Sequence, residues 1–182
     1  WDGAALNLGA VTWGNGATGI VGVVSALNSL VGSMASDFVG YGGVTALSNG
    51  NYVVSSSYWS GTEAWTGAVT WGNGTTGTAG TVSASNSLVG STAHDNVGDW
   101  GVAALTNGNY VVRSPFWDGT ATDVGAATWG NGTTGIVGVV SASNSLVGST
   151  AGDRVGFPFV TALANGNYVV SSNNWDGAAP NV

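Results

Sequence analysis

The chain has 182 residues, 32 of them glycine and none cysteine, and its formal net charge is −7 with two arginines and no lysine. This composition argues against nucleic-acid binding, because phosphate contacts need clustered Lys and Arg. The same deficit argues against binding to anionic membrane surfaces. The absence of cysteine excludes both a disulfide framework and a thiolate metal site.

The low charge content also bears on assembly and location. Charged residues make up 6% of the chain, against about 25% in an average soluble domain. A surface of Gly, Ser, Thr and Asn has little electrostatic repulsion to keep copies apart, so we expect self-association. No apolar run approaches the ~20 residues of a membrane-spanning helix, so we expect no membrane insertion. We expect an exported segment whose leader peptide lies upstream.

The sequence repeats itself every 58 residues. Trp13, Trp71 and Trp129 each stand in the string TWGNG. Two further series keep the same spacing: Trp1, Trp59, Trp117 and Trp175, and Asp37, Asp95 and Asp153. Such regularity predicts one repeat array over 1–182. Its units are repeat 1 at about 1–58, repeat 2 at about 59–116, repeat 3 at about 117–174 and a C-terminal overlap at 175–182.

The first predicted elements of the central copy form a hairpin. Residues 44–48 and 51–55 are short β-type runs, and Asn49-Gly50 between them predicts a type I′ turn. The same pair recurs as Asn107-Gly108 and Asn165-Gly166. We therefore expect one such hairpin in each repeat.

Further strands follow after a loop around Trp59. Strands are predicted at 67–71, 80–84 and 88–91, with a turn at 72–74. No apolar pattern of helical period occurs, so helix content should be negligible.

These elements predict an all-β protein built from antiparallel blades. A sheet of four or five short strands cannot bury both faces alone, so it must stack on its neighbours. Radial stacking gives a β-propeller and linear stacking gives a solenoid or fibre; the hairpins favour blades. Three blades rarely close a ring. Because WDGAA stands at both ends of the chain, we expect further repeats or other subunits to complete it.

Several strings also support a resemblance to known repeats. The order LVGSTAxDxVG, VxALxNGNYVVxS, a W-D-G loop and GAVTW at 67–71 resembles the FG-GAP blade of integrin-like β-propellers. The strings NSLVGST and NGNYVVSS are similar to repeats of large bacterial filamentous-haemagglutinin-type surface proteins. The resemblance implies propeller-like blades in a bacterial adhesin. FG-GAP blades often bind calcium through several acids, whereas this chain has one Asp in the corresponding stretch of each repeat, so we expect no metal and no cofactor.

The periodic aspartates are candidates for metal ligands or catalytic acids, but a structural role is the favoured interpretation. Asp37, Asp95 and Asp153 are predicted to accept backbone N–H bonds in their turns. His94 is the single histidine and has no counterpart in the other repeats, so it cannot belong to a repeated site. We therefore expect no catalysis.

The nine tryptophans are the main clue to binding. Aromatic faces beside Asn and Asp are typical of sugar sites. Candidates for glycan stacking are the loop residues Trp1, Trp59, Trp117 and Trp175 with Asp2, Asp118 and Asp176; packing is the alternative. Packing between blades is favoured for Trp13, Trp71 and Trp129. Trp65 and Trp100 have no counterparts and are interpreted as surface variation.

The sequence thus predicts a non-catalytic structural or adhesive module that assembles with itself. Its expected place is the extracellular space or the bacterial cell surface. The alternative is a multivalent carbohydrate-binding propeller with one weak site per repeat and affinity gained through avidity.

Overall fold

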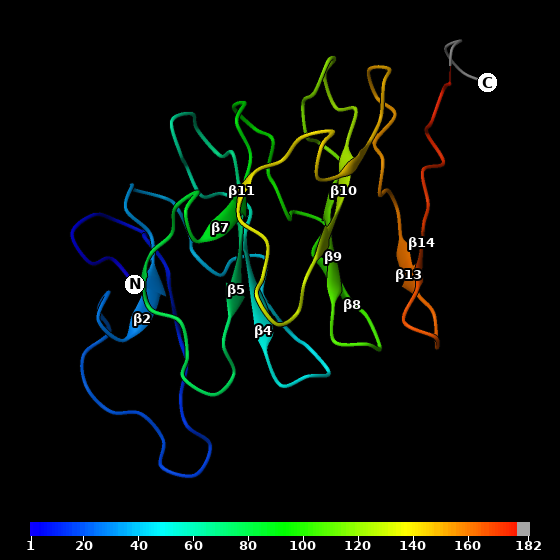
Figure 1. Cartoon of the computed structure of the whole chain (residues 1–182). Coiled ribbons are helices and arrows are strands. Elements are labelled where there is room, and N and C mark those ends of the chain that lie inside the picture. The colour runs from blue at the N-terminus through cyan, green and yellow to red at the C-terminus, as the bar shows by residue number, and fades with distance from the viewer. Residues whose placement is uncertain (178–182) are drawn as a thin grey trace.

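A computed structural model describes residues 1–177 as a row of small β-sheets without a helix (Figure 1). The predicted C-terminal overlap at 175–182 therefore lies outside the described residues from 178 onward. In chain order the strands are β1 (Ala10–Thr12), β2 (Ser29–Val31), β3 (Val44–Ala46), β4 (Tyr52–Ser56), β5 (Ala68–Gly72), β6 (Gly80–Thr81), β7 (Ser87–Val89), β8 (Val102–Ala104), β9 (Tyr110–Ser114), β10 (Ala126–Gly130), β11 (Gly138–Val139), β12 (Leu146–Val147), β13 (Val160–Ala162) and β14 (Tyr168–Val170).

The two central blades are each an antiparallel meander of four strands. In the central blade β3 pairs with β4, β4 with β5 and β5 with β7, in the register Val44↔Val54, Val54↔Thr70 and Thr70↔Ser87. The next blade repeats the order as β8, β9, β10 and β12. The pairs β1–β2 and β13–β14 supply parts of the same pattern at the two ends. The all-β fold of antiparallel blades in tandem is thus confirmed.

One predicted strand has a different role. The strand expected at 80–84 is limited to β6, which pairs parallel with β2 of the preceding blade. Its equivalent β11 pairs parallel with β7 in the same way. The strand at 80–84 was expected among the antiparallel strands of its own blade. Instead, the second and third repeats each contribute a short parallel strand to the sheet before them.

The hairpin turn also differs from the predicted type. Gly50 N–H donates to Leu47 O (3.0 Å), which places Ser48 and Asn49 at the centre of the turn. Gly50 follows at a φ of 87°, while Asn49 has no positive φ. This is the three-residue hairpin loop with glycine in the left-handed position after the turn. The type I′ prediction for Asn49-Gly50, Asn107-Gly108 and Asn165-Gly166 is therefore wrong in turn type, although each hairpin lies where it was expected.

The hydrophobic cores lie between successive sheets. Val53 packs in the core between the second and third blades, and its neighbour Val54 packs in the core toward the first blade. Adjacent strand residues point to opposite faces, so a blade enclosed on both sides buries them both. This explains the consecutive valines of the NYVVS string.

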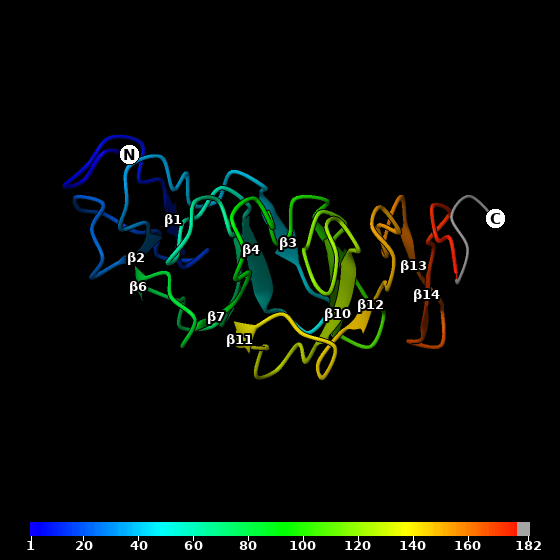
Figure 2. The ribbon, with the colours of Figure 1, turned by 90° about the horizontal axis from the view of Figure 1, so that it is seen from above.

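The sheets follow one another in a row, consistent with propeller-like blades that do not close a ring within this chain. Seen from above, the first and the last described residues lie at opposite ends of the row (Figure 2). The described residues contain no helix with the length and apolarity of a membrane span.

Candidate functional site

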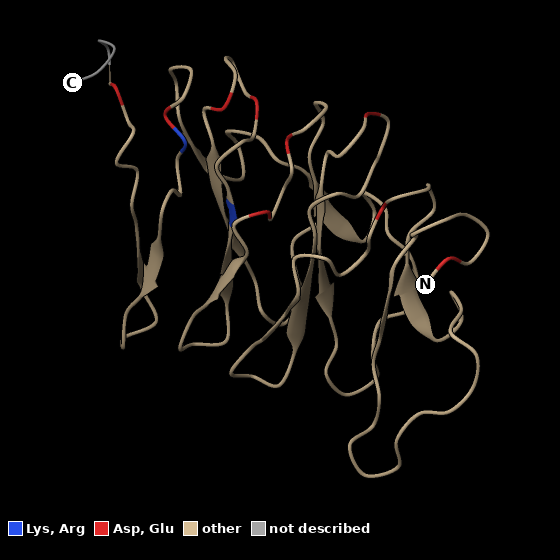
Figure 3. Ribbon diagram, turned by 180° about the vertical axis from the view of Figure 1, so that it is seen from behind, with Lys and Arg blue, Asp and Glu red and all other residues tan. Residues whose placement is uncertain are grey.

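The row has two unlike edges. Acidic residues are concentrated along the edge formed by the Trp loops and the aspartate turns (Figure 3). The hairpin turns at 47–51, 105–109 and 163–167 form the opposite edge and contain no charged residue. We call these the acidic edge and the hairpin edge.

The periodic aspartates of the acidic edge hold two blades together. Asp95 is buried, and its Oδ2 accepts N–H bonds from Ser91 (2.8 Å) and Thr92 (2.9 Å) in its own turn. Its Oδ1 accepts the N–H of Asp118 (2.9 Å) in the Trp loop of the next blade. Asp37 and Asp153 make the same three contacts. These carboxylates are occupied by backbone donors, as expected of turn aspartates.

Two of these carboxyls differ in pKa. Burial raises the pKa of Asp95, and the backbone bonds from Thr92, Asp118 and Ser91 offset this only in part. For Asp153 burial also acts upward, but the backbone bonds from Asp176, Thr150 and Ser149 together bring the pKa below its usual value. The pKa of the aspartate is therefore raised in the central copy of this motif and lowered in the copy near the end of the row.

The aspartates proposed to accompany glycan stacking close their own loops. Asp2 Oδ1 accepts the N–H of Asn7 (3.0 Å), and Asp118 Oδ1 accepts that of Asp123 (2.8 Å). Asp176 donates its N–H to Asp153 Oδ1 (3.0 Å). The hydrogen bonds described for all three aspartates thus join the backbone of the loops and turns.

The loop tryptophans divide into two classes. Trp59 and Trp117 are only 6% and 7% exposed and belong to the cores between blades. Trp1 and Trp175, at the two ends of the row, are exposed. Stacking of a sugar on Trp59 or Trp117 is therefore wrong as a prediction, because their ring faces are covered by protein.

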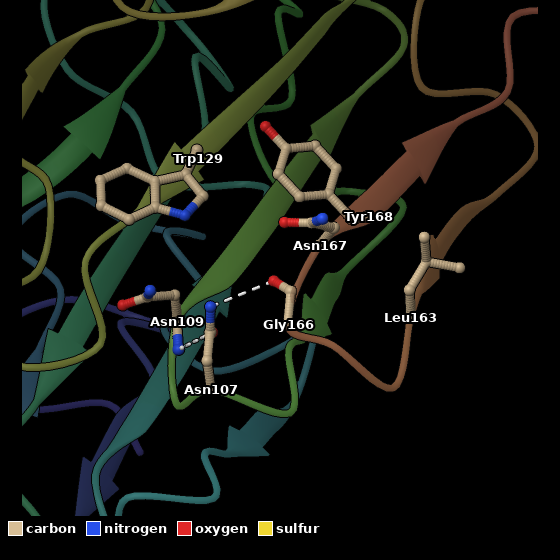
Figure 4. Close-up of a pocket in the computed structure, with 7 residues that line it drawn as sticks. All are labelled: Asn107, Asn109, Trp129, Leu163, Gly166, Asn167 and Tyr168. Carbon is tan, nitrogen blue, oxygen red and sulfur yellow. Dashed lines mark hydrogen bonds between the residues drawn. The ribbon is translucent and has the colours of Figure 1, made fainter.

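The tryptophans of the TWGNG strings pack between blades on the hairpin edge. Trp13 Nε1 donates to Gly74 O (3.1 Å) and Trp71 Nε1 to Gly132 O (2.9 Å), each in the following blade. Trp129, in contrast, is exposed. It lies beside a hollow of about 580 Å³ that Asn109 and Tyr168 also line (Figure 4).

The hairpin asparagines take part in the same junction. Asn49 Nδ2 and Asn51 Nδ2 both donate to Gly132 O (2.8 Å each), so three donors of one blade converge on a single carbonyl of the next. In the hollow of Figure 4, Asn107 Nδ2 donates instead to Gly166 O (3.1 Å). Asn49 and Asn107 thus join blades as well as forming turns.

A row of aromatic side chains on the acidic edge escaped the sequence analysis. Neighbouring rings meet edge to face, with centroids 4.8 Å apart for Tyr41–Tyr58, 5.6 Å for Tyr58–Trp65 and 5.1 Å for Trp65–His94. Phe38 contacts Tyr41 and Tyr58, both at 6.2 Å. We call Phe38, Tyr41, Tyr58, Trp65 and His94 the aromatic row. Trp65 thus has a defined set of partners beyond surface variation.

The signal for this row was the pattern of differences between repeats. At the repeat positions of Phe38, Tyr58 and Trp65, the next copy carries Asn96, Phe116 and Asp123. Residues that vary against a constant framework are where one repeat can acquire its own binding properties.

At the position equivalent to the aromatic row, the next repeat has an ion pair beside an aromatic ring. Arg154 lies 5.3 Å from the centroid of the Phe116 ring, and its Nη2 is 3.3 Å from Asp123 Oδ2. Nearby, Trp100 packs edge to face on Phe157 at 4.6 Å. Within residues 1–177, no group of three His, Cys, Asp or Glu side chains is placed to hold a metal ion.

The comparisons with known proteins agree with the repeat architecture. No curated protein and no solved structure matches the chain. A family model described as a repeat of unknown function, DUF5650, matches residues 1–41, 46–99, 104–157 and 162–182. These matches cover most of the sequence, so the chain belongs to the DUF5650 repeat family.

Proposed function

We propose that this protein is a non-catalytic structural module that stacks blade on blade and joins other copies of itself through the same junction. We further propose that it serves as an adhesive part of an exported bacterial surface protein. The FG-GAP and haemagglutinin-type resemblance and the weakly charged surface support this assignment.

The observation that carries the proposal is an exposed strand edge at β12. Leu30 and Leu88, at the equivalent position of earlier blades, are 1% and 0% exposed, whereas Leu146 is 57% exposed. The earlier leucines are covered because β6 and β11 pair beside them, in the register Leu30↔Gly80 and Leu88↔Gly138. Among the described residues, β12 has no parallel partner of this kind. An unpaired edge with exposed apolar side chains favours association.

The opposite end of the row offers the complementary segment. Residues 22–23 occupy the repeat position of β6 and β11, and Ile20, Val21 and Val23, in and just before this segment, are exposed. Paired parallel with β12 of a second copy, Gly22 would stand opposite Leu146 as Gly80 stands opposite Leu30. The Gly14-Asn15-Gly16 turn of that copy would then approach Trp129 as Gly132 approaches Trp71.

The multivalent carbohydrate alternative receives less support from the geometry. It requires an equivalent stacking tryptophan in each repeat, and the burial of Trp59 and Trp117 removes two of the four. Self-association needs no such site.

The test is the mass of the 182-residue chain in solution, measured by light scattering and sedimentation across micromolar concentrations. We expect oligomers that grow with concentration, and Leu146→Asp should shift them toward monomer because a buried unpaired charge is costly. Leu6→Asp is the matched control: Leu6 is exposed, and its equivalents Ala64 and Thr122 stay exposed inside the row. A monomer at every concentration would refute self-assembly. Protease accessibility on intact cells tests the proposed surface location.

A further inference from the structure

We propose that the aromatic row is a docking surface for a basic polypeptide segment, whose Arg or Lys side chains lie over its rings. This contact is separate from self-assembly, since the row lies on the acidic edge and the blade junction described above involves β12 and the hairpin edge. It also differs from a carbohydrate site in the charge that it requires of its ligand.

The first argument is the accessibility of the row. Tyr41 is 65% exposed, Trp65 40% and Phe38 36%. Phe38 and Tyr41, together with Trp1, also line a hollow of about 290 Å³. A group of exposed aromatic side chains of this extent is uncommon on a protein without a partner.

The second argument is charge. Asp2, Glu63 and Asp99 are exposed acids, and acidic residues are concentrated along the edge that carries the Trp loops (Figure 3). Asp99 is near enough to Tyr58 to contribute, after Tyr41 and burial, to the raised pKa of that phenol. Both arginines are engaged elsewhere: Arg113 Nη1 donates to Pro158 O (3.0 Å), and Arg154 pairs with Asp123. An Arg or Lys side chain over these rings must therefore come from outside these 182 residues.

The third argument is the equivalent place in the next repeat. There a guanidinium already lies against the Phe116 ring and is held by an acid, Asp123. The counterpart of Phe116 in the aromatic row is Tyr58, but the counterpart of Arg154 is Asn96, whose Nδ2 donates to Ser57 O (3.0 Å). The row thus keeps the aromatic half of a cation–π pair and lacks the cation.

Carbohydrate recognition has a weaker basis at the row. A sugar needs several polar groups placed around the stacking ring. The periodic carboxylates of this edge, Asp37 and Asp95, are buried, and both oxygens of each accept hydrogen bonds from backbone N–H groups. The field of the remaining acids selects for positive charge.

The experiment measures binding of a fluorescein-labelled Arg-Gly repeat peptide by anisotropy, with the citrulline-Gly analogue as the uncharged control ligand. We expect the arginine peptide to bind, the analogue to bind about tenfold more weakly, and Tyr41→Ala with Trp65→Ala to produce a similar loss. Trp175→Ala is the matched control, because Trp175 is an exposed tryptophan of the acidic edge outside the row. A chain with Tyr41→Ala and Trp65→Phe should bind the arginine peptide more tightly than the chain with both alanines.

Three outcomes would overturn the proposal. Equal binding of the citrulline peptide would remove the role of the cation. Binding unchanged by loss of both rings would reduce the contact to charge alone. A neutral oligosaccharide that binds in place of the peptide and depends on Trp65 would assign the row to carbohydrate. The Leu146→Asp variant should bind the peptide like the natural chain, so a failure of docking and a failure of self-assembly are read separately.

Discussion

The same repeat position has different surroundings inside the row and at its ends. Trp71 donates to Gly132 in the next blade, whereas its counterpart Trp129 borders an open hollow. Leu88 is fully buried, and its counterpart Leu146 is exposed. Since these strings are almost identical in sequence, the difference comes from the neighbour. The stable unit of this fold is therefore the junction between two blades, as in other repeat proteins.

The largest expected effect contrasts two loop tryptophans. Trp117→Ala should lower the free energy of unfolding by about 3–5 kcal/mol, because it empties a core that joins two blades. Trp175→Ala, at the exposed end position, should change it by about 0.5 kcal/mol or less. Urea denaturation followed by circular dichroism measures both. Equal losses would show that the loop, rather than the junction, is what Trp117 stabilises.

A glycine pair sharpens the comparison through sterics alone. A Cβ on Gly132 would stand 1.6 Å from the carbonyl oxygen of Gly108, so backbone must move to admit it. Gly132→Ala should cost about 1–3 kcal/mol or more. The same change at Gly16, its counterpart in the first repeat, meets nothing within 4 Å and should cost about 0.5 kcal/mol or less. Thermal unfolding of the two variants, at a dilution where the chain is monomeric, is the measurement. A Gly16→Ala loss as large as that of Gly132→Ala under these conditions would contradict the junction argument.

Much of the blade could be predicted from local patterns. The Asn-Gly hairpins, the GAVTW strand and the absence of helix follow from turn chemistry and alternation, which act within a few residues. The turn type was missed because an Asn-Gly pair also suits the three-residue loop with glycine in the left-handed position, which all three hairpins adopt. β6 was assigned to the wrong sheet because its partner β2 lies in another repeat.

The candidate site was harder to predict because its residues break the repeat. Reasoning from periodicity gives weight to Trp59 and Trp117, which fold the array and are buried. It discounts Phe38, Tyr41 and Trp65, whose counterparts differ in every copy. A residue that recurs in all repeats is explained by stacking first, so the search for binding residues belongs among the exceptions.

The smallest expected effects are on the pH dependence of stability, through Asp95 in the centre of the row and Asp153 near its end. The lowered pKa of Asp153 means that its carboxylate stabilises the fold above the unfolded value of about 3.9, and this contribution is lost as the pH falls through the folded value. The raised pKa of Asp95 has the opposite sign. Its contribution is fully present below the unfolded value and is lost as the pH rises through the folded value.

Asn replacements separate the two contributions when unfolding is measured from pH 7 down to pH 3. The stability deficit of Asp153→Asn should shrink as the solution is acidified, because the natural chain then loses the same carboxylate. The deficit of Asp95→Asn should instead grow, because the natural chain gains a proton that its folded state prefers. Parallel pH profiles would mean that the two aspartates have the same surroundings, and the enclosure of Asp95 between two complete blades would then not distinguish it from Asp153.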